Sequence, residues 1–169
     1  MAEQRWRDLA GNEWVTIDAP PKAIKDGWPA GTTEIPMVPI PARVPQGTDV
    51  DAERDRRIAL GFTWNGKAYQ SRQFDLDNIR SMGAAATAMI AQGSEDSGYR
   101  WFDPAQDFVW IAADNTLTPM SASDMIDFAL TAAIWVKNNI FAASAIKATA
   151  GGIPADYAAN ARWPNAPAS

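Results

Sequence analysis

The chain has 169 residues, of which 47% are hydrophobic and 21% are charged, and its formal net charge is −5. This length supports one domain with a hydrophobic core and some appendages. The acidic net charge argues against nucleic-acid binding, which favours a clustered basic face. Cysteine and histidine are both absent, which excludes disulfides, zinc–thiolate sites and catalysis by Ser–His or Cys–His groups.

The N-terminal stretch MAEQRWRDLAGNEW is polar and does not have the pattern of a signal peptide. No run reaches the roughly 18 to 20 consecutive apolar residues that cross a bilayer. We therefore expect a soluble protein that is made in the cytoplasm and does not insert into a membrane. Its tryptophans are spread from Trp6 to Trp163, which favours packing or contact sites over a single cofactor site, and no cofactor is expected.

Residues 1–48 are predicted to form a small hairpin followed by an extended arm. Trp6 and Trp14 stand on either side of a polar turn, and apolar residues alternate after it as in a strand. Prolines recur between residues 18 and 48, and because proline lacks a backbone donor this segment is neither a helix nor a central strand. On composition alone, a linker and an arm that binds a partner are equally favoured. The apolar side chains favour the arm, which would become ordered along its partner. The predicted partner contacts in the arm are Ile35, Met37, Val38 and Ile40.

A short charged helix is predicted over residues 48–60. Thr48 or Asp49 would cap its N-terminus, and Gly61 would end it. Its arginines and acids are interpreted as a solvated face with a few intrahelical pairs.

A hairpin and a second helix follow. Asn65-Gly66 between two short apolar runs is a strong hairpin signal, and it places Phe62 and Trp64 on one face, with Tyr69 across from them. Residues 74–92 read as a helix with Asp75 as its N-cap. The small residues on its apolar side would let another helix approach closely. Short strands on either side of a turn at 114–115 are expected between residues 99 and 120.

The longest predicted helix covers residues 121–150, where proline and glycine are absent. Ser121 with Asp124 three residues later indicates its start. At about 100° per residue, one apolar face contains Met125, Phe128, Trp135 and Ile146. A second apolar stripe lies beside it and is predicted to contact a partner: Ile126, Leu130, Ile134 and Phe141. A short helix over residues 155–162 is the alternative cover for this stripe.

Few residues indicate catalysis. Asp103, Asp107 and Asp114 lie near aromatic residues in the sequence, as paired carboxylates do in glycosidases, but aspartates followed by Pro or Asn are typical turn residues. A weaker hypothesis is a non-catalytic glycan-binding face. Its predicted contacts are Trp101, Phe102 and Trp110.

Several motifs between residues 51 and 150 together resemble a known family. They are RIALGF at 57–62, WNGK at 64–67, Asp75 and Ile79, Trp110, DNT at 114–116, and TPMS at 118–121. This pattern is similar to an uncharacterised domain family encoded among the tail genes of tailed bacteriophages and prophages. The resemblance implies a place in a tail tip, a tail fibre or fibre assembly, and it carries over no catalytic residue.

These observations predict an α+β protein: a small helical domain with a long C-terminal helix packed on a second helix and short β-hairpins, preceded by an extended proline-rich arm. The expected parts are an N-terminal hairpin and arm (1–48), the phage-tail-type domain (49–150), and a short helix and tail (151–169). The expected function is a non-enzymatic structural protein of the virion tail. It would bind other tail proteins and form homo-oligomers or occur in several copies. The alternatives are a tail-fibre assembly chaperone and a host-surface carbohydrate-binding module.

Overall fold

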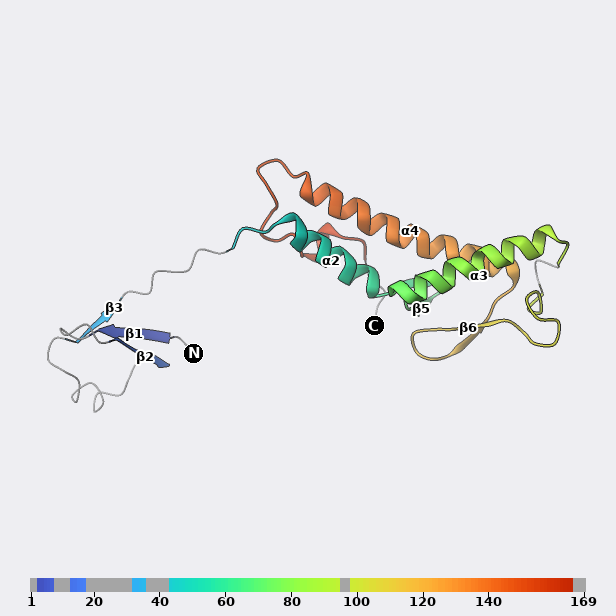
Figure 1. Cartoon of the computed structure of the whole chain (residues 1–169), viewed down its shortest axis with the longest axis horizontal. Helices are drawn as coiled ribbons and strands as arrows, with labels where there is room; N and C mark the ends of the chain where they lie inside the picture. Colours follow the sequence, from blue (N-terminus) through green and yellow to red (C-terminus); the bar gives the residue numbers. More distant parts are fainter. Residues whose placement is uncertain (1–2, 8–12, 18–31, 36–42, 95–97, 166–169) are drawn as a thin grey trace. The chain divides into compact units, whose positions relative to one another are not determined.

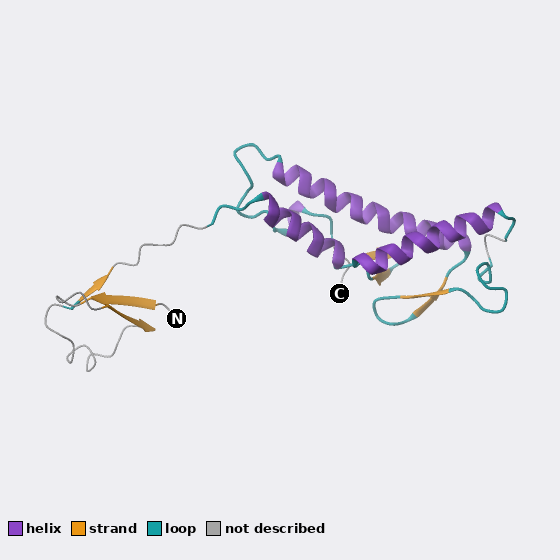
Figure 2. Cartoon of the chain, viewed as in Figure 1, coloured by secondary structure: helices purple, strands orange, loops and turns teal. Residues whose placement is uncertain are grey.

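The computed structural model describes residues 3–7, 13–17, 32–35, 43–94 and 98–165, which form two compact units, 1–43 and 44–169. In the described residues, the first unit contains strands, and the second combines three α-helices with two short antiparallel hairpins (Figures 1 and 2). The α+β class expected from the sequence is therefore confirmed.

The first unit contains a three-stranded antiparallel sheet in the order β2-β1-β3. Strand β1 (Glu3–Arg7) pairs with β2 (Glu13–Ile17), so that Trp6 lies opposite Trp14, as the predicted hairpin requires. Strand β3 (Thr33–Ile35) pairs with the other edge of β1.

The predicted arm needs correction at both ends. Ile35 belongs to a sheet strand, because its backbone can pair with β1 where no proline interrupts the chain. At the other end, Gly47 and Thr48 already belong to a helix. The remaining predicted arm contacts, Met37, Val38 and Ile40, lie outside the described residues.

Helix α2 (Gly47–Ala59) begins one residue earlier than predicted and has a different cap. Gln46 occupies the N-cap position, and its backbone N–H donates to the Asp49 carboxylate over 2.7 Å. Asp49 thus acts from the third helical position as the acid of a capping box. Gly61 follows with φ of 103°, where a Cβ atom would collide with the carbonyl oxygen of Tyr69.

Strands β4 (Phe62–Trp64) and β5 (Lys67–Tyr69) form the predicted hairpin. Asn65 and Gly66 have φ values of 47° and 75°, as a two-residue type I′ turn requires. The alternation of the strand buries Phe62 and Trp64 on one face, and Tyr69 is buried opposite Phe62.

Helix α3 (Gln73–Ala91) packs against the long helix α4 (Ala122–Lys147). Arg72 occupies the N-cap of α3, and Asp75, predicted as the cap, instead accepts the backbone N–H of Arg72 from the third helical position. A Cβ atom on Gly83 would lie 2.7 Å from the Cβ of Ala129 on α4. Helices α3 and α4 therefore approach each other closely, as the small residues of α3 led us to expect.

Strands β6 (Val109–Ile111) and β7 (Leu117–Pro119) form the second hairpin of this unit and lead into α4. Asn115 in the turn has φ of 65°. At the start of α4, the Asp124 N–H donates to Ser121 Oγ over 3.1 Å, and the Ser121 N–H donates back to the Asp124 carboxylate over 3.0 Å. This reciprocal pair is the predicted helix start.

Helices α2 and α3 both pack against α4 (Figure 1). By length and composition alone α4 could cross a membrane, a criterion that core helices of soluble proteins also meet. Its predicted first face, including Met125, Phe128 and Trp135, is buried.

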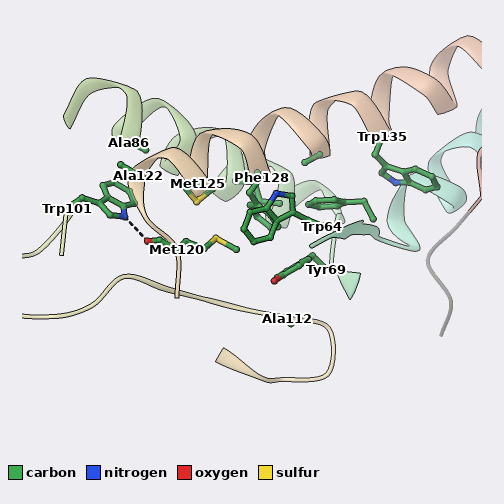
Figure 3. Close-up of a cluster of buried hydrophobic side chains, with 13 residues drawn as sticks. Trp64, Tyr69, Ala86, Trp101, Ala112, Met120, Ala122, Met125, Phe128 and Trp135 are labelled. Carbon is green, nitrogen blue, oxygen red and sulfur yellow. Dashed lines mark hydrogen bonds between the residues drawn. The ribbon is translucent and has the colours of Figure 1, made fainter. Parts of the chain in front are cut away.

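The main core surrounds Phe128 (Figure 3). Its ring centroid lies 4.7 Å from that of Tyr69, 5.1 Å from Phe62, and 5.5 Å from both Trp64 and Trp110. These spacings are typical of favourable aromatic pairs. The two hairpins therefore supply the rings that cover the first half of α4.

A smaller second core lies at the other end of α4, where Val50, Ala143, Ile146 and Trp163 are buried together. The helix predicted for residues 155–162 is reduced to turns and a short 3₁₀-helix, η1 (Asn160–Arg162). Trp163 holds this segment in place, and its indole N–H donates to the Tyr157 carbonyl over 2.7 Å.

Candidate functional site

The second apolar stripe of α4 divides into a buried and an exposed part. Ile126 is half-buried and packs against the main core. The other three side chains are exposed: Leu130 by 57%, Ile134 by 44% and Phe141 by 66%. These three are the outer stripe. No described part of the chain buries them.

The C-terminal segment is not the cover of the outer stripe. Its anchors, Tyr157 and Trp163, pack with Val50 of α2 and with Ala143 and Ile146 on the first face of α4. The 100° step between helical residues places those α4 positions on the opposite side from the outer stripe.

An open apolar groove of about 560 Å³ runs beside the outer stripe, between α3 and α4. Its small lining residues include Gly83 and Ala84 of α3 and Ala129 and Ala133 of α4. Ile140 and Phe141 extend it along α4, so groove and outer stripe are continuous. We call the two together the α3–α4 face. A continuous exposed apolar surface of this kind is typical of a protein-binding site.

The charged side chains that line the groove are both cationic: Arg80 on α3 and Lys137 on α4. Arg80 pairs with the exposed Asp77 over 3.1 Å, and Gln73 donates to the same carboxylate oxygen over 3.0 Å. Lys137 is exposed and has no ionic partner within the described ranges. The groove is therefore apolar with positive charge at its edges.

The three predicted glycan contacts do not form one exposed surface. Trp101 is only 4% exposed, and its indole N–H donates to the Met120 carbonyl over 2.9 Å (Figure 3). Trp101 is thus a core residue, which corrects its prediction as a stacking platform. Trp110 is half-buried on Phe128. Phe102 is 54% exposed.

The nearby aspartates make local contacts. Asp103 accepts the backbone N–H of Ala105, and Asp107 pairs with Arg100 over 2.8 Å. Asp114 accepts the backbone N–H and the hydroxyl of Thr116, and these hydrogen bonds lower the pKa of Asp114. Such bonds are typical of turn aspartates.

No group of three or more Asp, Glu, His or Cys side chains that could hold a metal ion occurs among the residues that the structure describes. The groove between α3 and α4 is apolar, and its lining contains two cationic side chains and no carboxylate. This arrangement suits protein binding better than acid–base chemistry.

Sequence reasoning missed a buried charge cluster that joins α2 to the C-terminal segment. Arg57, predicted on a solvated face, is only 3% exposed. It donates to Glu53 over 2.6 Å and to the Ala158 carbonyl over 2.8 Å, and its guanidinium lies 5.1 Å from the centre of the Trp163 ring. The spacing from Glu53 to Arg57 suggested an intrahelical pair, but only the fold places Trp163 over it.

Asn139 is a second missed residue. It lies on α4 and is fully buried. Its amide donates to the Trp135 carbonyl over 3.0 Å, while its side-chain oxygen accepts no hydrogen bond from the described residues.

Comparison with known families identifies a match for the second unit. The model of the family described as Domain of unknown function (DUF4376) matches residues 41–161, which is most of the chain and nearly all of the second unit. No curated protein and no solved structure matches the sequence. The chain therefore belongs to the DUF4376 family.

Proposed function

We propose that this protein is a non-enzymatic structural component of a bacteriophage tail, at the tail tip or in a tail fibre. It joins neighbouring tail proteins, is made in the host cytoplasm and resides in the virion. The resemblance of residues 51–150 to domains encoded among phage tail genes supports the tail location. The observation that carries the binding role is the α3–α4 face.

The size and position of the α3–α4 face favour attachment. The outer stripe and the groove expose large apolar side chains on one side of the unit, among them Leu130, Ile134 and Phe141. Burial of each such side chain contributes about 1.5–3 kcal/mol, so several together supply a large part of the free energy of a protein–protein contact. The partners at this face are other tail proteins, and the chain itself forms homo-oligomers or occurs in several copies per virion.

The location is tested by mass spectrometry of washed, purified virions. A structural protein remains with the particles in a constant ratio to other tail proteins. If the protein is required for tail assembly but is missing from finished particles, it is an assembly chaperone and the structural role is wrong.

The binding surface is tested with Leu130→Glu combined with Ile134→Glu. Both side chains are exposed, so the variant should fold, whereas a carboxylate buried without a partner would abolish docking. The matched control places two glutamates at Ile111 and Leu117, which are 58% and 61% exposed on the β6–β7 hairpin. Normal incorporation of the first variant would show that the outer stripe is not a contact.

A further inference from the structure

We propose that the groove between α3 and α4 binds an acidic amphipathic helix of a different protein, and not a second copy of this chain. This inference rests on the proposed role in binding tail proteins and identifies the chemistry of the partner at the groove. Three properties of the groove lead to it: its length, its small lining residues and the sign of its charges.

The groove has the dimensions of a helix-binding site. Its lining extends from Gln73 to Thr87 on α3 and from Ile126 to Phe141 on α4. At 1.5 Å per residue, each helix contributes roughly 20 Å, which corresponds to about four turns of a bound helix. A helix of about 14 residues would therefore fill it.

The lining residues allow close approach. Gly83 is buried against Ala129 where α3 and α4 meet, and the small side chains of Ala84 and Ala133 are exposed along the groove. Large apolar side chains stand beside them, including Leu76 and Ile140. A docked helix could insert leucines or similar residues at positions i, i+3 or i+4, and i+7 between these side chains.

Charge selects the partner. Arg80 and Lys137 are the charged residues of the lining, and both are exposed. Asp77 already neutralises part of the Arg80 charge, whereas Lys137 forms no ion pair among the described residues. Carboxylates beside the apolar face of the incoming helix would pair with these cations and would accelerate association.

The same charges disfavour a second copy. Closed dimers are two-fold symmetric, so each copy presents the same surface to the other. Such a contact across the groove would bring together Arg80 and Lys137 from both copies, and the Asp77 carboxylate that pairs with each Arg80 would offset only part of this positive charge. Like charges that face each other in an interface oppose association.

The test uses two fluorescein-labelled 18-residue helical peptides that have the same leucine face. One carries glutamates beside the leucines, and the other carries lysines at the same positions. Fluorescence anisotropy with the full chain at low salt should show at least tenfold tighter binding of the glutamate peptide. Added NaCl should reduce this preference.

Two variants locate the binding. Arg80→Glu with Lys137→Glu should reverse the preference between the peptides, while the control, Lys67→Glu with Arg100→Glu, changes the net charge equally outside the groove and should keep it. Ala133→Phe fills the groove at an exposed position and should weaken glutamate-peptide binding at least tenfold.

Several results would overturn the inference: no binding of the glutamate peptide, equal binding of both peptides, or unchanged binding by Ala133→Phe. A dimer of the wild-type chain in light scattering that Ala133→Phe dissociates would also overturn it, since the second copy would then occupy the groove. In these cases the tail role stands if virion incorporation still depends on Leu130 and Ile134. If the chain binds the glutamate peptide but is not incorporated into virions, the tail role is refuted and the inference about the groove stands.

Discussion

The close contact between α3 and α4 can be tested by exchanging a glycine across it. Gly83 faces Ala129, and a Cβ atom at position 83 would lie 2.7 Å from the Ala129 Cβ. Carbon atoms in contact prefer about 3.5–4.0 Å, so Gly83→Ala would force the helices apart. Ala129→Gly should remove the obstacle, and the two changes together should restore the contact with the glycine on the other helix.

The expected free energies follow from helix propensity and packing. Replacing Gly83 with Ala stabilises a helix interior by about 1 kcal/mol, and overpacking costs about 1–3 kcal/mol, so this variant should lose up to about 2 kcal/mol. Ala129→Gly should lose about 1 kcal/mol of propensity. In the double variant the propensity changes cancel and the overpacking disappears, so its stability should be close to that of the wild type. The coupling energy is then about 1–3 kcal/mol.

Urea unfolding of the four proteins, followed by tryptophan fluorescence, measures this cycle. Gly47→Ala is a control, because a Cβ atom there would meet only the Lys147 side chain at an ordinary distance of 3.7 Å, and it should not destabilise. Additive effects of the two changes, or a stability gain of about 1 kcal/mol for Gly83→Ala alone, would show that the helices do not meet at these residues.

Three further predictions concern the second core and the buried polar groups. Trp163→Ala should lower the free energy of unfolding by about 3–5 kcal/mol in urea titrations, whereas the exposed Phe102→Ala should have little effect; equal effects would place Trp163 outside the core. Asn139→Leu should raise the free energy of unfolding by about 1 kcal/mol, because it removes a buried oxygen that accepts no hydrogen bond from the described residues; a clear loss in the same titration would reveal a donor to that oxygen. Hydrogen bonds from Arg56 and then Arg57 lower the pKa of Glu53 below its ordinary value of 4.5, so its stabilising contribution is complete above pH 4.5 and is lost as the pH falls through the lower folded pKa. Unfolding measured from pH 6 to pH 3 should therefore show a steeper acid loss for the wild type than for Glu53→Gln, and identical profiles would contradict this assignment.

Features that depend on neighbouring residues could be read from the sequence. The Ser121–Asp124 start of α4 and the Asn65-Gly66 turn are set by hydrogen bonds and backbone angles within a few residues. The buried face of α4 also follows from local geometry, since a 3.6-residue repeat puts Met125, Phe128 and Trp135 on one side. The exact first residue of a helix could not be read in this way. An acid is favoured both at the N-cap and in the first turn, and Asp49 and Asp75, predicted as caps, lie at the third helical position.

Features that depend on distant segments were decided by the tertiary structure. Arg57 is buried because residues some hundred positions later return over α2, and the residues around it in the sequence do not show this. Trp101 is buried, and its indole N–H donates to the carbonyl of Met120, which lies 19 residues later; its neighbours in the sequence do not show this contact.

The candidate site shows the same division. Apolar periodicity identified Leu130, Ile134 and Phe141 as a second stripe, but exposure depends on what packs over them, and only the fold places the C-terminal segment elsewhere. The groove required two helices to meet at Gly83 and Ala129. Periodicity within one helix determines which residues share a face, whereas the packing of separate elements determines whether that face is covered.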